Sequence, residues 1–426
     1  MNLKGKKLLL LGGSRNMKEI LDVAHDMGVW VGVTDWYDTK RSPVKLMADE
    51  YFDTSIEDYD GLIEIISTHA YDGVLTGYTD SYLLPYAETC KRAKLPCYGT
   101  SEQFEILTDK IKYKQLFRKY GVPTLPEYKL EDINENFTGF PLLLKPTKGS
   151  GGKGLVQVYN YPEFLQVTNN AGDTEYLIEP YIDERKELTA FFLFVNGEIY
   201  LSGTANRFLS NPQGEKIALP ILYSMPSSYD RAFRETTAPP MIKMFKDLGL
   251  KNGILFAQCI VDNGVSLVYD IGYRLTGSLE YKLQEKLYGF NPLKMLVYHS
   301  LTGNNYLEKK DLDQKLKDND KNYGFNVTIL GREGSISKIE GENDILSIPE
   351  IIDCTFKLVE GESITESMIG TLGQIIARIF FVTDSIEAAS DVLNQIYELI
   401  YIYDQDGEEM ILDRFTPEQL KVEYYK

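Results

Sequence analysis

The stretch PLLLKPTKGSGGKG, residues 141–154, sets the interpretation of the rest of the chain. Its apolar residues 142–144 predict a short buried strand, and Lys145 follows at the end of that strand. Glycines and a second lysine, Lys153, then form a loop that can wrap backbone N–H groups around an anion. The loop is not a P-loop, because G-x-x-x-x-G-K-[ST] is absent, and residues 155–158 predict a strand where a dinucleotide fingerprint would open a helix. The stretch therefore predicts a phosphate-binding loop, with a plain flexible hairpin turn as the alternative.

The composition is that of a folded, acidic protein with more than one domain. Its 426 residues exceed one compact core, and 43% hydrophobic with 12% aromatic residues is typical of globular proteins. A net charge of −18 argues against a nucleic-acid partner, but not against a nucleotide held in a local positive cradle. The four cysteines lack zinc spacing and predict free thiols in a reducing, cytoplasmic setting. We expect no signal peptide or membrane span, because the apolar run near the N-terminus is short.

The first hundred residues alternate between strand and helix patterns. Strands are predicted at 7–11, 29–34, 51–53 and 71–76, and helices at 17–27, 59–69 and 83–93. This alternation indicates a parallel α/β domain, in which ligands bind beyond the carboxyl ends of the strands. The polar residues expected there are Ser14, Arg15, Asp35 and Asp80. Each can contact a substrate, or simply cap a helix or turn.

The remainder reads as a strand-rich core followed by a smaller α+β module. Helices are predicted over 102–120 with a break at 108–110, over 240–248 and over 290–301, and hairpins over 189–203 and 256–271. The run 308–321 is highly charged and predicts a solvated connector. Beyond it we expect short strands, including 400–403 and 410–412, with helix in part of 363–374 and over 385–398.

The order of these signals resembles the ATP-grasp superfamily, specifically carboxylate–amine ligases with a biotin-carboxylase-like three-domain layout. The signals are Asp109-Lys110, Lys145 with its glycine loop, Glu179 to Ile182 with Glu187 beyond, and a hairpin carrying Gln258 and Asp270 with Arg274 after it. Each motif is weak alone, and their order and spacing carry the resemblance over nearly the whole chain. It implies an N-terminal parallel α/β (pre-ATP-grasp) domain at 1–103, an ATP-grasp core at 104–302 with a lid subdomain at about 125–182, and a C-terminal α+β module at 303–426.

The resemblance implies an ATP site. The implied nucleotide-binding residues are Lys110, Lys145, Gly149, Ser150, Gly151, Gly152, Lys153, Glu179, Tyr181, Ile182 and Glu187. The two fixed lysines would touch ATP phosphates, since a point charge on a flexible stem suits a phosphate that changes geometry. The glycine loop would close over the phosphates, the backbone of residues 179–182 would read adenine, and Glu187 would hold the ribose hydroxyls. Lys110 as a solvated helix charge, and Glu187 as part of a charged run, are the alternatives.

The implied magnesium site departs from the family pattern. The family hairpin presents a carboxylate, a glutamate twelve residues on and an asparagine two further, which hold Mg²⁺ ions bridging the ATP phosphates. Here the spacing is kept, but the residues are Gln258, Asp270 and Gly272. Asp270 is thus the sure anionic ligand, which leaves one well-held ion, or a further ligand borrowed from Glu280.

Strand pairing sets a condition on this metal site. Directly paired residues share a face of a hairpin. With a two-residue loop, Asn263-Gly264, Asp270 would pair with Ala257 and face away from Gln258. We therefore predict an odd-length loop that includes Asp262, if both residues hold metal, and we expect a two-residue turn to exclude Gln258 as a ligand.

The implied reaction joins a carboxylate to an amine. The substrate carboxylate attacks the γ-phosphate of ATP, and an amine then displaces phosphate from the acyl phosphate. Arg274, whose planar fork suits an acyl phosphate or carboxylate, and Lys145 are the predicted catalytic residues. Thr276-Gly277-Ser278 resembles the small-residue loop beside the acceptor. The implied partners are small-molecule carboxylate and amine substrates, with no nucleic acid or membrane, and relatives of this kind often form homodimers.

Two other readings stay open, and a third is disfavoured. One is a purine-pathway ATP-grasp enzyme resembling glycinamide ribonucleotide synthetase; an aminoimidazole ribonucleotide carboxylase or a biotin carboxylase fits the motifs less well. A second is a nucleotide-binding protein with weakened catalysis, which Gln258 and Gly272 favour. A nicotinamide dehydrogenase is disfavoured, because its glycine fingerprint is missing from the first strand–helix turn.

Overall fold

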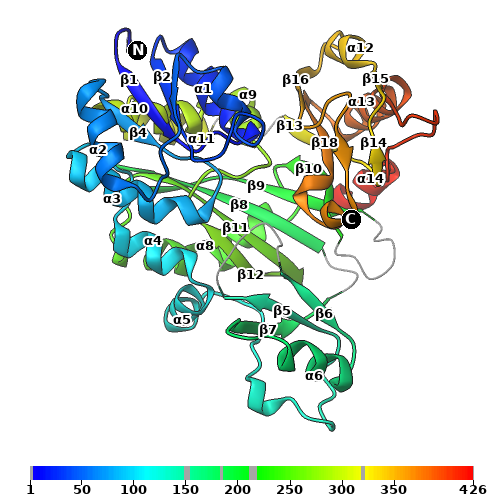
Figure 1. Ribbon diagram of the computed structural model, residues 1–426. Helices are drawn as coiled ribbons and strands as arrows, with labels where there is room; N and C mark the ends of the chain where they lie inside the picture. Colours follow the sequence, from blue (N-terminus) through cyan, green and yellow to red (C-terminus); the bar gives the residue numbers. More distant parts are fainter. Residues whose placement is uncertain (1–2, 148–153, 183–185, 211–217, 318–321, 426) are drawn as a thin grey trace.

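The computed structural model describes residues 3–147, 154–182, 186–210, 218–317 and 322–425. Figure 1 shows an N-terminal α/β layer, a large central sheet, a small projecting sheet and a C-terminal module. The fold is therefore a mixed α/β architecture with a large antiparallel sheet and, as the sequence predicts, a parallel sheet at the N-terminus. Among the described residues, no helix combines the length and apolarity that a membrane crossing requires.

The N-terminal sheet is parallel, in the order β3-β2-β1-β4. Its strands are β1 (Lys7–Leu11), β2 (Trp30–Thr34), β3 (Glu50–Phe52) and β4 (Gly73–Leu75), and its helices are α1 (Lys18–Asp26), α2 (Tyr59–Thr68) and α3 (Leu83–Ala93). A later helix, α10 (Pro292–Thr302), packs against this sheet. A Cβ at Gly73 would lie 2.3 Å from the carbonyl oxygen of Ser300, so glycine permits that close approach.

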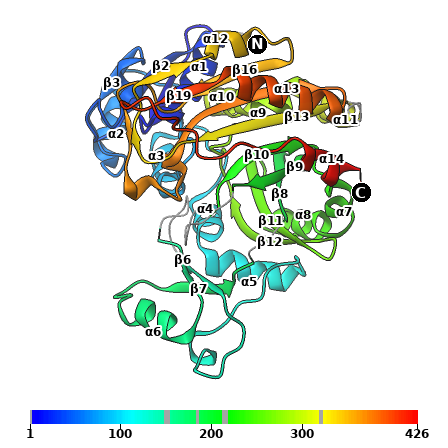
Figure 2. The same cartoon turned by 90° about the vertical axis from the view of Figure 1, so that its right-hand side faces the viewer.

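Two helices and a small sheet follow. Helices α4 (Ser101–Thr108) and α5 (Lys110–Tyr120) meet at Asp109, whose side chain accepts from the N–H groups of Ile111 and Lys112. The predicted break is thus an N-cap. The antiparallel sheet β6-β5-β7 contains β5 (Leu142–Pro146), β6 (Val156–Val158) and β7 (Tyr176–Pro180), with α6 (Tyr161–Asn169) on it. It projects away from the N-terminal and C-terminal layers in both views (Figures 1 and 2).

The central sheet has eight strands, in the order β12-β11-β8-β9-β10-β13-β18-β16. Their bounds are β8 (Lys186–Val195), β9 (Glu198–Leu209), β10 (Pro220–Met225), β11 (Gly253–Asp262), β12 (Val265–Gly272), β13 (Tyr323–Leu330), β16 (Ile351–Phe356) and β18 (Ile375–Thr383). Helices α7 (Asp230–Thr236), α8 (Ala238–Asp247) and α9 (Tyr281–Tyr288) contact its strands. β10, which precedes the predicted domain boundary at residues 302 and 303, pairs with β13, which follows it, so one sheet spans both predicted domains.

The C-terminal module adds α13 (Ile386–Leu399) and α14 (Glu418–Tyr424), with β19 (Tyr401–Tyr403) pairing β15 (Lys338–Glu340) and α12 (Glu342–Leu346) nearby. Three expectations fail here, and the first is the strand predicted at 410–412, where the structure has only isolated bridges of Glu409 with Tyr403 and of Ile411 with Gly331. The charged run contains a helix, α11 (Lys309–Lys317), because Leu312 is buried against the rest of the protein. The stretch 363–374 forms a short strand, β17 (Ser363–Ile364), and two 3-10 turns rather than an α-helix.

Candidate functional site

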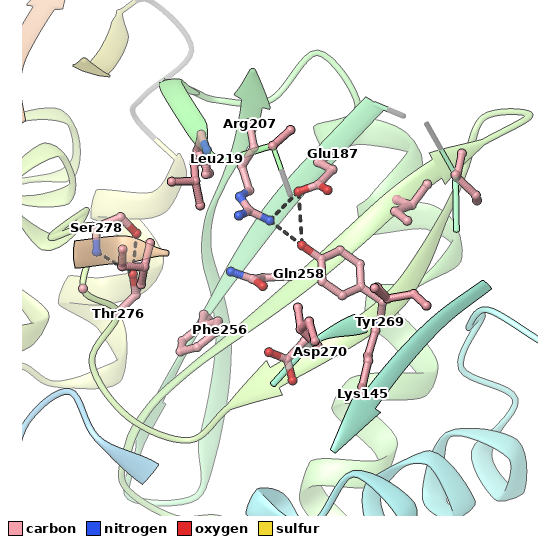
Figure 3. A pocket seen from close by; sticks show the side chains of 18 of the residues that line it. Lys145, Glu187, Arg207, Leu219, Phe256, Gln258, Tyr269, Asp270, Thr276 and Ser278 are labelled. Atoms are coloured by element: carbon pink, nitrogen blue, oxygen red, sulfur yellow. Dashed lines mark hydrogen bonds and ion pairs between the residues drawn. The ribbon is translucent and has the colours of Figure 1, made fainter. Parts of the chain in front are cut away.

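One cavity gathers most of the predicted site residues. It is lined by Lys110, Lys145, Tyr181, Ile182, Glu187, Gln258, Asp270, Arg274, Thr276, Gly277 and Ser278. They come from α5, the β5–β7 sheet, the central sheet and the loop after β12. Figure 3 shows the labelled side chains around this cavity, with Gln258 and Asp270 close together. The predicted loop residues Gly149, Ser150, Gly151, Gly152 and Lys153 lie outside the described residues.

In the hairpin β11–β12, Gln258 and Asp270 lie on the same face, as a shared metal site requires, but not for the predicted reason. Asp262 pairs with Val265, so the turn is the two-residue Asn263-Gly264, with φ of 47° and 79°. The predicted odd-length loop is therefore wrong. The register shifts within the strands instead, so that Tyr269 is an extra, bulged residue. The bulge places Asp270 directly opposite Gln258, and both line the cavity.

Gly272 stands where the family's metal pattern has its third ligand, and an aromatic ring occupies the space that a side chain at this position would need. Gly272 pairs with Phe256 across the hairpin. A Cβ at Gly272 would lie 2.5 Å from the Phe256 ring, which leaves no room for a side chain there. The same ring lies under Arg274, whose guanidinium carbon is 5.1 Å from the ring centre.

Lys145 is held by a buried ion-pair triad. Its Nζ lies 2.5 Å from one oxygen of Glu179, and Lys114 Nζ lies 2.5 Å from the other. Burial alone raises the pKa of Glu179, but Lys145 and Lys114 outweigh it and hold that pKa below its ordinary value. The Glu179 side chain thus faces the two lysines, and it is not among the residues that line the cavity. Lys145 also lies 4.9 Å from the centre of the Tyr269 ring.

The predicted ribose carboxylate, Glu187, has a buried arginine partner. Arg207 Nη1 donates to both Glu187 and the Tyr269 hydroxyl, and that hydroxyl donates to Glu187 over 3.1 Å. Figure 3 shows this cluster on the strands that face the cavity. The bulge matters again, because it lets Tyr269 and Asp270, consecutive in sequence, both line the cavity.

Arg274 joins the N-terminal layer to the site. Its Nε and Nη2 donate to the two oxygens of Asp80, over 2.6 and 2.8 Å, and Nη1 donates to the Leu275 carbonyl over 2.9 Å. Asp80 opens a 3-10 turn just beyond β4, so the carboxyl end of the parallel sheet does reach the site. The Arg274 guanidinium, which is predicted to hold a substrate anion, is thus paired with Asp80 in this structure.

Sequence reasoning missed several cavity residues. They are Arg207, Tyr223, Phe256, Tyr269 and Arg378. Arg378 gave a readable signal, since it is the single charge in the apolar strand IIARIFFVT. A buried charge in such a strand demands a partner or a purpose.

Comparisons with known proteins agree with this architecture. No family model matches the chain. The L-amino acid ligase of Bacillus licheniformis superposes with a TM-score of 0.76 at 18% identity, over 94% of this chain and 99% of that one. Phosphoribosylglycinamide synthetase from Anaerococcus prevotii gives 0.72 at 21% identity, over 94% and 100%. The chain has the ATP-grasp fold.

Curated relatives support the same assignment over shorter stretches. A formate-dependent phosphoribosylglycinamide formyltransferase of Sulfurisphaera tokodaii is 30% identical over 199 residues, 43% of this chain and 49% of the relative. The biotin carboxylase of Pseudomonas aeruginosa is 25% identical over 217 residues, 46% and 42% respectively. The chain thus spans about half, or less, of the length of the curated relatives it matches.

The donors that face this cavity suit the binding of a magnesium ion. Among the described residues, no group of three or more His, Cys, Asp or Glu side chains could hold a metal by itself. Asp270 supplies one carboxylate, whose Oδ1 accepts from the Tyr113 hydroxyl over 2.9 Å, and Gln258 supplies an amide oxygen opposite it. The Phe256 ring blocks a ligand at position 272. One carboxylate and one amide oxygen are hard donors of the kind that Mg²⁺ prefers, and they leave the other coordination positions to be filled by other ligands.

Proposed function

We propose that this protein is an ATP- and Mg²⁺-dependent ligase that joins a carboxylate to an amine through an acyl phosphate and releases ADP and phosphate. The observation that carries the proposal is the convergence of Lys110, Lys145, Gln258 and Asp270 on one cavity of an ATP-grasp fold. Two cations and a hard-oxygen pair are what a transferring phosphate and its metal require. A chain with the same fold bears the name L-amino acid ligase.

In this proposal the residues act mainly by position and charge. Lys110 and Lys145 offset the charge of the ATP phosphates, and the Glu179 side chain keeps Lys145 in place. Asp270 and Gln258 hold Mg²⁺, which when bound bridges phosphate oxygens and spreads their charge. Glu187 holds the ribose, and Arg207 holds Glu187. Arg274 would bind the acyl phosphate. Since its guanidinium is paired with Asp80, that ion pair has to open, or the guanidinium has to contact both groups at once.

The rest of the site and assembly belong to the same proposal. The backbone of Glu179, Tyr181 and Ile182 would read adenine; the Tyr181 N–H already donates to the Pro141 carbonyl over 2.9 Å. The loop from Gly149 to Lys153 would close over the phosphates. The division at 1–103, 104–302 with its lid at about 125–182, and 303–426 is proposed, as are a homodimer and a cytoplasmic setting. The four cysteines are free in the structure, which suits that setting.

The test is release of phosphate and ADP from MgATP with amino acids and other small carboxylic acids, singly and in pairs. We expect a pair to stimulate release and to give a product whose mass is the sum of both minus water. Asp270→Asn should lower this rate about 100-fold or more, because it removes the one carboxylate that holds metal, whereas Asp262→Asn, at the exposed turn, should not. ATP binding without stimulated turnover would instead identify a nucleotide-binding protein, the alternative that Gly272 and Phe256 favour.

A further inference from the structure

Arg378 is a buried cation on the wall of the cavity. It lies in β18, in the C-terminal module, and is 2% exposed. It pairs with Thr328 of β13, and its side chain is among those that line the cavity. The C-terminal module therefore contributes a charged group to the cavity, beside Gly370 and Leu372 of the same module.

The hydrogen bonds of Arg378 within the described residues leave its Nε unused. Nη1 donates to Thr328 Oγ1 over 2.7 Å and to Asn326 Oδ1 over 3.4 Å. Within the described ranges, Nε has no acceptor and no carboxylate oxygen lies within 4.0 Å of the guanidinium. A buried guanidinium without an anion is costly, so the site is incomplete by itself. Burial lowers the pKa of Arg378 as a consequence.

Arg207 and Lys357, which act electrostatically on Arg378, have the same sign as Arg378, whereas the acid Glu280 acts on it from beyond 4.0 Å and keeps an Oε1 without a hydrogen-bond partner among the described residues. Arg207 is paired with Glu187, and the Tyr223 ring lies between the two arginines, 5.9 Å from Arg207 and 5.7 Å from Arg378. Glu280 is buried beyond the Thr276 hydroxyl, which donates to it over 3.1 Å, and Lys357 donates to the Gly277 carbonyl over 3.1 Å.

Arg378 is tied to the loop beside the acceptor. Asn326, which accepts from Arg378, donates its Nδ2 to the Ser278 carbonyl over 2.7 Å. From β11, which carries Gln258, to β18 there are five strand steps, β8, β9, β10, β13 and β18. Arg378 and Gln258 therefore line the same cavity from strands that are well separated in the sheet order.

We propose that Arg378 binds a carboxylate of the amine-bearing substrate, one that does not react and is retained in the product. The inference rests on the proposed ligase function and adds a substrate class to it: the amine is an α-amino acid or a similar amino carboxylate. Nε and Nη2 present the side of the fork that pairs bidentately with a carboxylate. A single guanidinium near the buried acid Glu280 suits a monoanion better than a dianionic phosphate. This disfavours a phosphoribosyl substrate.

The test is calorimetric binding to the whole protein in the presence of ADP and Mg²⁺, without turnover. Each of the twenty L-amino acids is compared with its carboxamide, which keeps the amine and loses the anion, and inorganic phosphate is a separate probe. We expect at least one amino acid to bind about tenfold or more tightly than its amide, the usual size of a charge-assisted pair. Arg378→Gln should abolish that ratio, Arg378→Lys should restore part of it, and Arg231→Gln, at an exposed helix position, should leave it unchanged.

ADP affinity separates the two proposals. If Arg378→Gln binds ADP within about twofold of the parent yet loses the ratio, the inference stands. If ADP does not bind the parent protein, the ligase proposal fails, while the amino acid and amide comparison is still readable. The inference is overturned if no amino acid is preferred over its amide, if Arg378→Gln keeps the preference, or if phosphate binds at this arginine in place of amino acids.

Discussion

Glu179 shows how a single buried acid can organise a cationic site. It is fully buried, and its two oxygens face Lys114 and Lys145. Burial lowers the pKa of Lys114, although Glu179 opposes that shift. Two lysines around one carboxylate leave a net positive charge next to the cavity, which is the sign that a nucleotide phosphate requires. The acid that carries the predicted adenine hinge therefore also fixes the predicted phosphate lysine.

Lys114→Met should destabilise the protein strongly. The substitution leaves Glu179 with Lys145 alone in a buried setting, and removing one partner of a buried ion pair costs about 3 kcal/mol or more. Urea unfolding near neutral pH measures the loss. Lys112→Met is the matched control on the same helix, because its ion pair with Glu105 is exposed to solvent and should contribute far less to stability. Equal losses for the two variants would contradict a structural role for the triad.

His299 should make stability depend on pH. It is buried in α10, its Nδ1 has no hydrogen-bond partner among the described residues, and burial lowers its pKa from 6.5 to about 4. Between these values the unfolded chain binds a proton that the folded protein does not, so the unfolding free energy falls as the pH falls. The full effect is about 3 kcal/mol. His299→Leu should flatten the curve between pH 6.5 and 4, with packing loss measured at pH 8; parallel curves for variant and parent would refute this.

At the scale of elements, local pattern predicts strands and helices well and register poorly. The parallel strands, the Asp109 break and both hairpins follow from periodicity and turn residues. The bulge at Tyr269 does not follow from local pattern. Its position depends on how β11 pairs with β12 on one side and with β8 on the other. The same holds for the candidate site. The residues that belong to spaced motifs could be predicted from the sequence, whereas Arg207 and Tyr223 are brought to the cavity only by strand pairing. Arg378 was visible in the sequence, but only the sheet shows where it points.

The hairpin gives a prediction about its own packing. Gly272→Asn, which restores the family residue, should destabilise the protein by about 1–3 kcal/mol, because its Cβ would meet the Phe256 ring. Phe256→Ala in the same chain should relieve the clash, so the double variant should be more stable than the sum of the two single effects. Thermal unfolding of the four chains in a double-mutant cycle measures this coupling. Strict additivity would show that the ring and the glycine are independent.

At the scale of the whole molecule, the predicted domains are joined more closely than three separate units. Arg274 pairs with Asp80 between the core and the N-terminal layer, and Arg15 pairs with Glu362 of the C-terminal module over 2.6 Å. β10 pairs with β13 across the predicted boundary, and Leu219, Ile221 and Leu222 belong to the hydrophobic cluster of the C-terminal module. The cavity accordingly takes residues from the second and third predicted domains, and the first contacts it through the ion pair of Asp80 with Arg274.

Residues 1–302 alone should therefore not form a stable monomer. Removing the module leaves β10 as an open edge and exposes Leu222, which is fully buried in the intact chain, so the fragment should aggregate. Size-exclusion chromatography of the fragment measures this, and co-expression with residues 303–426 as a second chain is the control, because the edge is then covered and the two pieces should elute together. A monomeric fragment that binds ADP like the intact protein would show instead that residue 302 ends an autonomous domain, and that the pairing of β10 with β13 adds little to stability.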